Sequence, residues 1–123
     1  MSSLFHSFQD GGWVMYVVFA LGLIAVSAAA HFALRGEHQL LGFIRWNLRA
    51  LLLCGAFGFT TGMIKVLHAS ARGDDFARTA RLILEGTSEA ANNPAAALMY
   101  SVLACIGIAI GQRRFPRPSA VAR

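Results

Sequence analysis

Charged side chains are scarce in this chain of 123 residues, and their scarcity narrows the class of protein. Only 14% of the residues are charged, whereas 56% are hydrophobic. A soluble domain usually carries about 25% charged residues. Mean hydropathy is +0.54. We therefore expect an all-α membrane protein with room for about three spans and no sizeable soluble domain.

Other absences exclude further classes. The only two cysteines, Cys54 and Cys105, lie in apolar segments, so neither a disulfide framework nor a zinc site is expected. There is no P-loop, no G-x-S-x-G and no His/Cys set with metal-ligand spacing, and we expect no enzyme, cofactor or metal. The net charge is +5, but the basic residues are scattered. They indicate topology and contact with lipid headgroups rather than nucleic-acid binding.

Long uncharged stretches predict three transmembrane helices within a single membrane domain, residues 1–123. The expected spans are 13–34, 42–67 and 77–112, followed by a basic tail at 113–123. The first span has 22 uncharged residues, and no Lys or Arg precedes it, so a secretory signal is not expected. The second has an uncharged core of only 15 residues, which snorkelling basic side chains at its ends can extend.

Turn-forming residues predict the connections. Gly36 is expected to end the first helix, and Gly73 marks a turn before the third. Either Asp74 or Asp75 can cap the third helix, since a carboxylate accepts hydrogen bonds from free N–H groups. Pro94 lies inside the third span and is expected to kink it.

The distribution of basic residues predicts orientation. Seven Lys or Arg residues fall on the side of the first loop and the tail, and four on the other side. The positive-inside rule then places the N-terminus outside and the C-terminus in the cytoplasm. The seven are Arg35, Arg45, Arg49, Arg113, Arg114, Arg117 and Arg123. The four are Lys65, Arg72, Arg78 and Arg81, which Asp10, Asp74 and Asp75 partly offset.

Three sequence patterns, in order, resemble the MotA/TolQ/ExbB proton-channel family. G-G-W-V-M-Y at Gly11 to Tyr16 is similar to the start of that family's first helix. G-F-T-T-G-M-I at Gly58 to Ile64 resembles the G-T-V-x-G-M-I of its second helix. E-G-T-S-E-A-A-N-N-P-A-A-A-L at Glu85 to Leu98 resembles the G-I-S-E-A-L-x-T-T-A-x-G-L of its third. The short outer hairpin and the expected topology agree with the family.

The resemblance implies a function and partners. Family members form a ring, typically a pentamer, around the membrane helix of a single-span partner such as ExbD or TolR, in the bacterial inner membrane. Ion flow through the assembly drives work across the envelope, and the second and third helices line the pore. Glu89 matches the carboxylate of the third-helix pattern. The chain would then be a small ExbB/TolQ-like channel or motor-stator subunit without the large cytoplasmic domain.

Five residues are candidates for an ion pathway: Glu89, Thr61, Thr60, Asn92 and Asn93. A carboxylate within lipid can bind and release protons, but Glu89 is also compatible with the outer headgroup level. The threonine hydroxyls face a pore or bond to their own helix carbonyls. The two asparagines beside Pro94 form either a polar ring at a pore or a satisfied kink between packed helices.

Small residues at three- and four-residue spacing predict close contacts between helices. This set comprises Gly55, Gly58, Gly62, Gly107 and Gly111. Near the start of the third span, Arg81 and Glu85 are four residues apart, which predicts an ion pair on one helix face.

Two departures from the family pattern leave alternatives open. Phe59 replaces a polar residue of the second-helix pattern, and Pro94 replaces the pore threonine of the third. A non-conducting ring or scaffold protein of the same fold is therefore the alternative function. A third possibility is an unrelated three-span protein, which would be a monomer or dimer rather than a ring.

Overall fold

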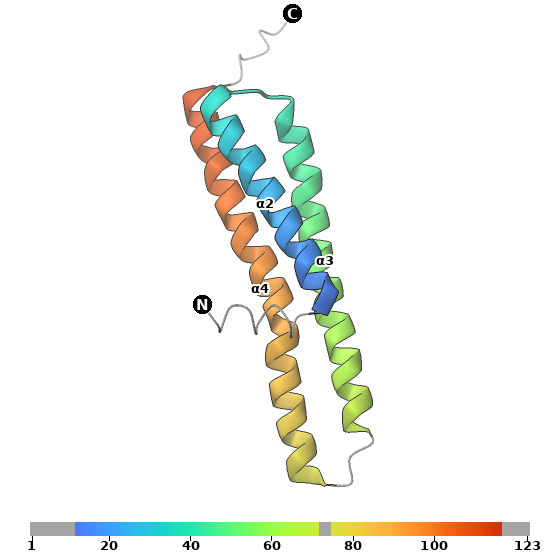
Figure 1. Ribbon diagram of the computed structural model, residues 1–123. Coiled ribbons are helices and arrows are strands. Elements are labelled where there is room, and N and C mark those ends of the chain that lie inside the picture. The colour runs from blue at the N-terminus through green and yellow to red at the C-terminus, as the bar shows by residue number, and fades with distance from the viewer. Residues whose placement is uncertain (1–11, 72–74, 117–123) are drawn as a thin grey trace, which may run out of the picture.

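The computed structural model of the protein describes residues 12–71 and 75–116 and consists there of three helices (Figure 1). They are α2 (Gly12–Arg35), α3 (Leu40–Ser70) and α4 (Phe76–Arg114). Each helix is long and apolar enough to cross a membrane, and no strand occurs in these ranges. The predicted all-α, three-span class is confirmed. Several residues named above lie outside the described ranges: Asp10, Gly11, Arg72, Gly73, Asp74, Arg117 and Arg123.

The helix ends follow the local signals in the sequence. Gly36 follows the last residue of α2 and has a φ of +71°, a left-handed conformation that glycine adopts without a steric penalty. Its N–H donates to the carbonyl of Phe32 at 2.9 Å. Asp75 is the N-cap of α4, and its carboxylate accepts from the N–H of Ala77 at 3.1 Å. Pro94 lies inside α4, which continues through it to Arg114.

The helices run up and down, and each contacts the other two (Figure 1). Two clusters of buried apolar side chains hold them together. The first lies near the α2–α3 turn and contains Ala25, Ala29, Phe32, Leu41, Ile44 and Ala104. The second lies further along the bundle and contains Val14, Val18, Leu51 and Ala97. The core is thin, which is expected for a protein whose outer surface meets lipid rather than water.

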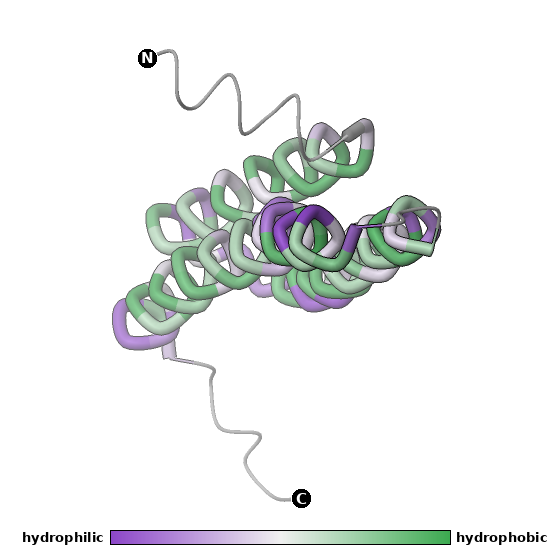
Figure 2. Tube along the Cα trace, turned by 90° about the horizontal axis from the view of Figure 1, so that it is seen from below, coloured by the Kyte–Doolittle hydropathy of each residue, from purple (hydrophilic) through white to green (hydrophobic). Residues whose placement is uncertain are grey.

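The outer surface is largely apolar. Leu34, Trp46 and Leu53 are each about 70% exposed (71%, 70% and 70%), and hydrophobic residues extend along the helices while hydrophilic residues gather near their ends (Figure 2). In water, such a surface would favour aggregation, but it matches a hydrocarbon environment. The chain is therefore a multi-pass membrane protein.

Small residues let α3 approach α4 closely. A Cβ built on Gly55 would lie 2.8 Å from the Cβ of Ala97, and one on Gly62 would lie 2.7 Å from the Cβ of Ala90. Gly58 lies between them in sequence and faces the same helix. All three positions exclude a larger side chain because there is no room for it. The three glycines and the facing alanines form a seam of close backbone contact.

Two further glycines bring α4 close to α2. A Cβ on Gly107 would lie 3.0 Å from the Cβ of Ala29, and a Cβ on Gly111 would lie 2.6 Å from the ring of Phe32. All five of the glycines that the sequence marks for packing thus lie against a neighbouring helix.

The α3–α4 hairpin extends beyond the beginning of α2 (Figure 1). At about 1.5 Å per residue, Trp13 and Arg35 of α2 are about 33 Å apart, and Arg45 and Lys65 of α3 are about 30 Å apart. Both separations match a hydrocarbon core of about 30 Å. Both helices are therefore long enough to cross a membrane.

Candidate functional site: a polar cleft between α3 and α4

A cleft of about 330 Å³ lies between α3 and α4, close to the beginning of α2. Its polar side chains are Thr61, Lys65, Glu89 and Asn93, and Trp13 of α2 also lines it. Three of the five predicted ion-pathway residues thus come together from two helices. The cleft also contains Gly58 and Gly62, so it lies along the α3–α4 seam.

Asn93 forms the inner end of the cleft. Its side chain is only 3% exposed and packs against Gly58, where a Cβ would lie 2.8 Å from both Cγ and Nδ2 of the amide. The Oδ1 atom is buried and has no hydrogen-bond partner within the described ranges. A buried amide oxygen without a partner is costly, because its lone pairs lose their hydrogen bonds to water. Asn93 is therefore set up to accept a hydrogen bond from a molecule in the cleft.

Pro94 adds a second acceptor close to Asn93. A proline inside a helix has no N–H, so it removes the bond that would otherwise reach the carbonyl four residues earlier. That carbonyl belongs to Ala90, which is 5% exposed and lines the same cleft. Pro94 thus leaves a backbone carbonyl one turn away without its usual helical partner.

Glu89 and Lys65 bring opposite charges to the wide end of the cleft. Both side chains are exposed, and no ion pair joins them in the part of the chain that the structure describes. Glu89 and Trp13 line the same cleft, so the carboxylate lies close to the beginning of α2. Sequence reasoning used Lys65 only to extend the span, and missed it as part of this site.

The two threonines differ in position but bond in the same way. The Thr61 hydroxyl donates to the carbonyls of Phe57 at 3.0 Å and Gly58 at 3.1 Å. The Thr60 hydroxyl donates to the carbonyl of Ala56 at 2.9 Å. Both donors are used within α3, so the hydroxyls offer only their oxygen lone pairs to other groups. Thr61 lines the cleft, whereas Thr60 is exposed on another face.

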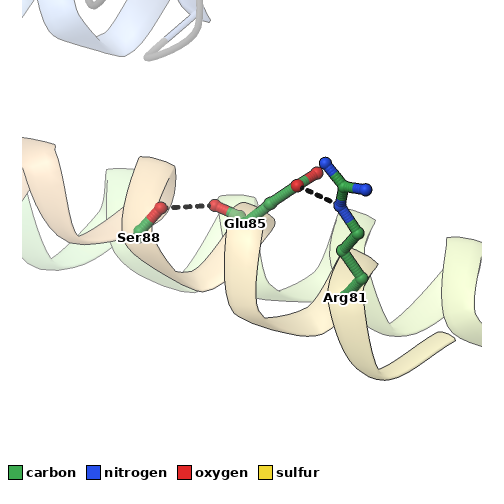
Figure 3. Close-up of polar contacts among 3 residues, drawn as sticks. All are labelled: Arg81, Glu85 and Ser88. Atoms are coloured by element: carbon green, nitrogen blue, oxygen red, sulfur yellow. Dashed lines mark hydrogen bonds and ion pairs between the residues drawn. The ribbon is translucent and has the colours of Figure 1, made fainter. Parts of the chain in front are cut away.

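Two other polar residues of α4 lie outside the cleft. Asn92 is half-buried and does not line it. Glu85 is engaged elsewhere: its Oε1 accepts from the Nε of Arg81 at 2.7 Å, and its backbone carbonyl accepts from the hydroxyl of Ser88 at 2.7 Å (Figure 3). The Arg81–Glu85 pair is confirmed. Its side chains are 81% and 56% exposed, so solvent screens it and it contributes little to stability.

Beyond Asn93, the seam closes. Gly55 packs against Ala97 and the backbone of Pro94, and the neighbouring interior contains apolar side chains such as Leu51. On α3, the buried polar residue is Asn47. It lies about 16 Å along the helix from Gly58, which packs against Asn93, at a rise of 1.5 Å per residue. Its Nδ2 donates to the carbonyl of Leu21 at 3.1 Å and ties α3 to α2.

Asn47 was not predicted from the sequence. It lies among basic and aromatic residues of a segment assigned to the membrane surface, and the only signal was an amide on the same helix face as the buried Leu51. An interhelical bond of this kind is worth about 0.6 kcal/mol on average in a membrane protein.

The cleft offers hydrogen-bond acceptors from both helices. Its side-chain acceptors are the Glu89 carboxylate and the oxygens of Asn93 and Thr61. No group of three or more His, Cys, Asp or Glu residues able to hold a metal occurs within 12–71 and 75–116. Water and protonated groups are the natural occupants of such a cleft.

Comparison with known proteins gave no match: no family model, no curated protein and no solved structure is similar to this chain.

Proposed function

We propose that the chain is a subunit of a membrane proton channel similar to ExbB and TolQ, and that the polar cleft receives protons at one membrane surface. The meeting of Glu89, Thr61 and Asn93 in one cleft carries the proposal. Glu89 exchanges protons with water, and Asn93 and Thr61 accept hydrogen bonds from water molecules further in. A cleft of about 330 Å³ has room for several water molecules, each of which takes up about 30 Å³ in the liquid.

In this proposal, several copies of the chain surround a single-span partner similar to ExbD or TolR. A pentamer in the bacterial inner membrane, with the N-terminus outside, follows from the family resemblance. Glu89 and Lys65 are exposed in the single chain, so a neighbouring subunit or the partner helix can reach both charges. The partner would complete the path that the closed seam below Asn93 interrupts.

The test compares two carboxylates on the same helix. Glu89→Gln should abolish proton flux into liposomes that hold the purified assembly, and should leave the mass of the assembly unchanged. Glu85→Gln is the matched control: it removes the same charge four residues away and outside the cleft, and should preserve flux. Equal flux in the wild type and in Glu89→Gln would contradict the role of Glu89.

A second candidate function is a non-conducting ring or scaffold of the same fold. The observation in its favour is the tight contact of Gly55 with Ala97 and Pro94, which closes the seam beyond Asn93. A scaffold would give a ring by native mass spectrometry but no flux above that of empty liposomes. A monomer or dimer would contradict both functions.

A further inference from the structure

A second cleft lies at the opposite end of the bundle, where the α2–α3 turn meets the end of α4 (Figure 1). Its volume is about 330 Å³. It is lined by His38, Leu41, Arg45, Gln112, Phe115 and Pro116. None of these residues belongs to the ion-pathway candidates. This cleft is therefore a site separate from the polar cleft around Glu89.

Local contacts hold the walls of this cleft in place. The ring of Phe115 packs over Gly36, so closely that a Cβ on that glycine would lie 2.5 Å from it. The N–H of Phe115 donates to the carbonyl of Gly111 at 2.8 Å. On the other wall, the His38 ring packs edge-on against Phe32 with ring centroids 5.7 Å apart. The turn and the end of α4 are thus fixed beside each other.

The polar groups of the cleft are suited to an anion. Arg45 offers guanidinium donors, and Gln112 offers an amide NH₂. Among the described residues, Arg45 has no ion-pair partner. His38 Nδ1 is buried without a hydrogen-bond partner, so no contact fixes the tautomer and the ring is free to carry its proton on Nε2 and donate from there. No carboxylate of residues 12–71 and 75–116 lines the cleft.

The charge around the cleft has the same sign. Five arginines lie at this end of the described chain, and Glu37 is the only acidic residue near them. The arginines are Arg35, Arg45, Arg49, Arg113 and Arg114. A zwitterionic headgroup carries an ammonium group, for which the described residues of this cleft offer no carboxylate. A headgroup with net negative charge would meet the Arg45 guanidinium and the hydrogen-bond donors of Gln112 and His38. The field and the cleft therefore favour an anion.

The depth and the apolar walls indicate the molecule that carries the anion. Arg45 lies about 30 Å along α3 from Lys65, a distance that matches the thickness of a hydrocarbon core. Leu41, Phe115 and Pro116 give the cleft an apolar wall beside its donors. A free phosphate ion has no apolar atoms to pack against that wall, whereas the glycerol and first acyl carbons of a lipid would pack on it.

We propose that this cleft binds the phosphate of an anionic phospholipid, with Arg45 as the main charged contact and Gln112 and His38 as hydrogen-bond donors. The inference does not depend on proton conduction, since neither Glu89 nor Asn93 takes part.

The experiment uses the purified full-length protein and native mass spectrometry to count bound lipid. Detergent micelles contain phosphatidylglycerol, phosphatidylcholine or inorganic phosphate. We expect phosphatidylglycerol to be retained at least tenfold more strongly than phosphatidylcholine. Arg45→Gln should weaken phosphatidylglycerol binding about tenfold, the order expected for loss of a charge-assisted hydrogen bond.

Arg49→Gln is the matched control. Arg49 lies on the same helix one turn away, carries the same charge and stacks on the Trp46 ring at 4.9 Å instead of lining the cleft. It should bind phosphatidylglycerol within about twofold of the wild type, the range expected for a screened surface charge. Gln112→Leu, which keeps every charge, should also weaken binding and guards against a folding defect specific to Arg45→Gln.

Three results would overturn the proposal. Equal losses in Arg45→Gln and Arg49→Gln would mean that only net charge matters. Equal retention of the two lipids would remove the anion preference. Displacement of the lipid by millimolar inorganic phosphate, together with phosphate bound in its place, would identify a soluble phosphate as the ligand.

Discussion

The amide of Asn93 lies directly against Gly58, so that a Cβ on the glycine would come within 2.8 Å of Cγ and Nδ2. Cγ1 of Val14, on α2, would lie 2.9 Å from the same Cβ position. Three helices therefore meet at Gly58, and the absence of a side chain on this glycine leaves space for the buried amide of Asn93.

The first prediction concerns this contact. Gly58→Val should lower the free energy of unfolding by about 1–3 kcal/mol, because the added atoms overlap Asn93 and Val14 in a packed interior. The measurement is reversible unfolding by SDS in mixed micelles. Gly42→Val on the same helix is the control, since a Cβ there meets nothing within 4 Å. If both variants lose the same stability, helix propensity rather than packing is the cause.

The second prediction separates the two buried asparagines. Asn47→Leu should lower the unfolding free energy by about 0.5–1.5 kcal/mol, because the bond to the Leu21 carbonyl is lost. Asn93→Leu should not lower it, because Oδ1 has no partner to lose. In the channel proposal, Asn93→Leu nevertheless reduces proton flux. A loss of stability in Asn93→Leu as large as that in Asn47→Leu would mean that Asn93 is structural.

The third prediction concerns Pro94. Pro94→Ala restores an N–H that can bond to the Ala90 carbonyl, and should raise the stability of α4, since an interior proline costs about 3 kcal/mol. In the channel proposal the variant also reduces proton flux, because a helical N–H then occupies the Ala90 carbonyl. Higher stability with unchanged flux would leave the proline without a role in conduction.

The fourth prediction concerns the α2–α3 turn. Gly36→Ala should lower the unfolding free energy by about 1–2 kcal/mol, because an L-residue resists positive φ and its methyl group displaces the Phe115 ring. Gly42→Ala serves as the control and should be neutral or stabilising. Phosphatidylglycerol binding should weaken in Gly36→Ala as well, since Phe115 forms part of that cleft. Wild-type stability in Gly36→Ala would contradict the claim that the positive φ and the Phe115 contact require glycine at this position.

The sequence predicted those features that depend on neighbouring residues. The three predicted spans lie within α2, α3 and α4, Gly36 follows the end of α2, and Asp75 caps α4. Each depends on hydropathy or on a backbone preference that acts over a few residues. The Arg81–Glu85 pair is also local, because a helix brings positions four apart onto one face.

The features that escaped prediction depend on the register between helices. Lys65 and Glu89 share a cleft only because α3 and α4 are aligned by the contacts of Gly55, Gly58 and Gly62. Sequence patterns mark those glycines as small, but they do not say which residue of α4 each one meets. The bond from Asn47 to the Leu21 carbonyl escaped for the same reason. Orientation, ring size and partner remain predictions.

The length by which α3 and α4 extend past α2 has a consequence for motion. The end of the α3–α4 hairpin forms a two-helix arm past the beginning of α2 (Figure 1), and Phe76 and Leu84 of this hairpin are 88% and 73% exposed. This two-helix arm should open locally at a lower free energy than the bundle, and its amides should exchange hydrogen for deuterium sooner. Gly86 packs against Val66 within the arm and also lines the polar cleft. We therefore expect a molecule that binds the end of this arm to change the width of the cleft around Glu89. The distance from Phe76 to Glu89 along α4 is about 20 Å.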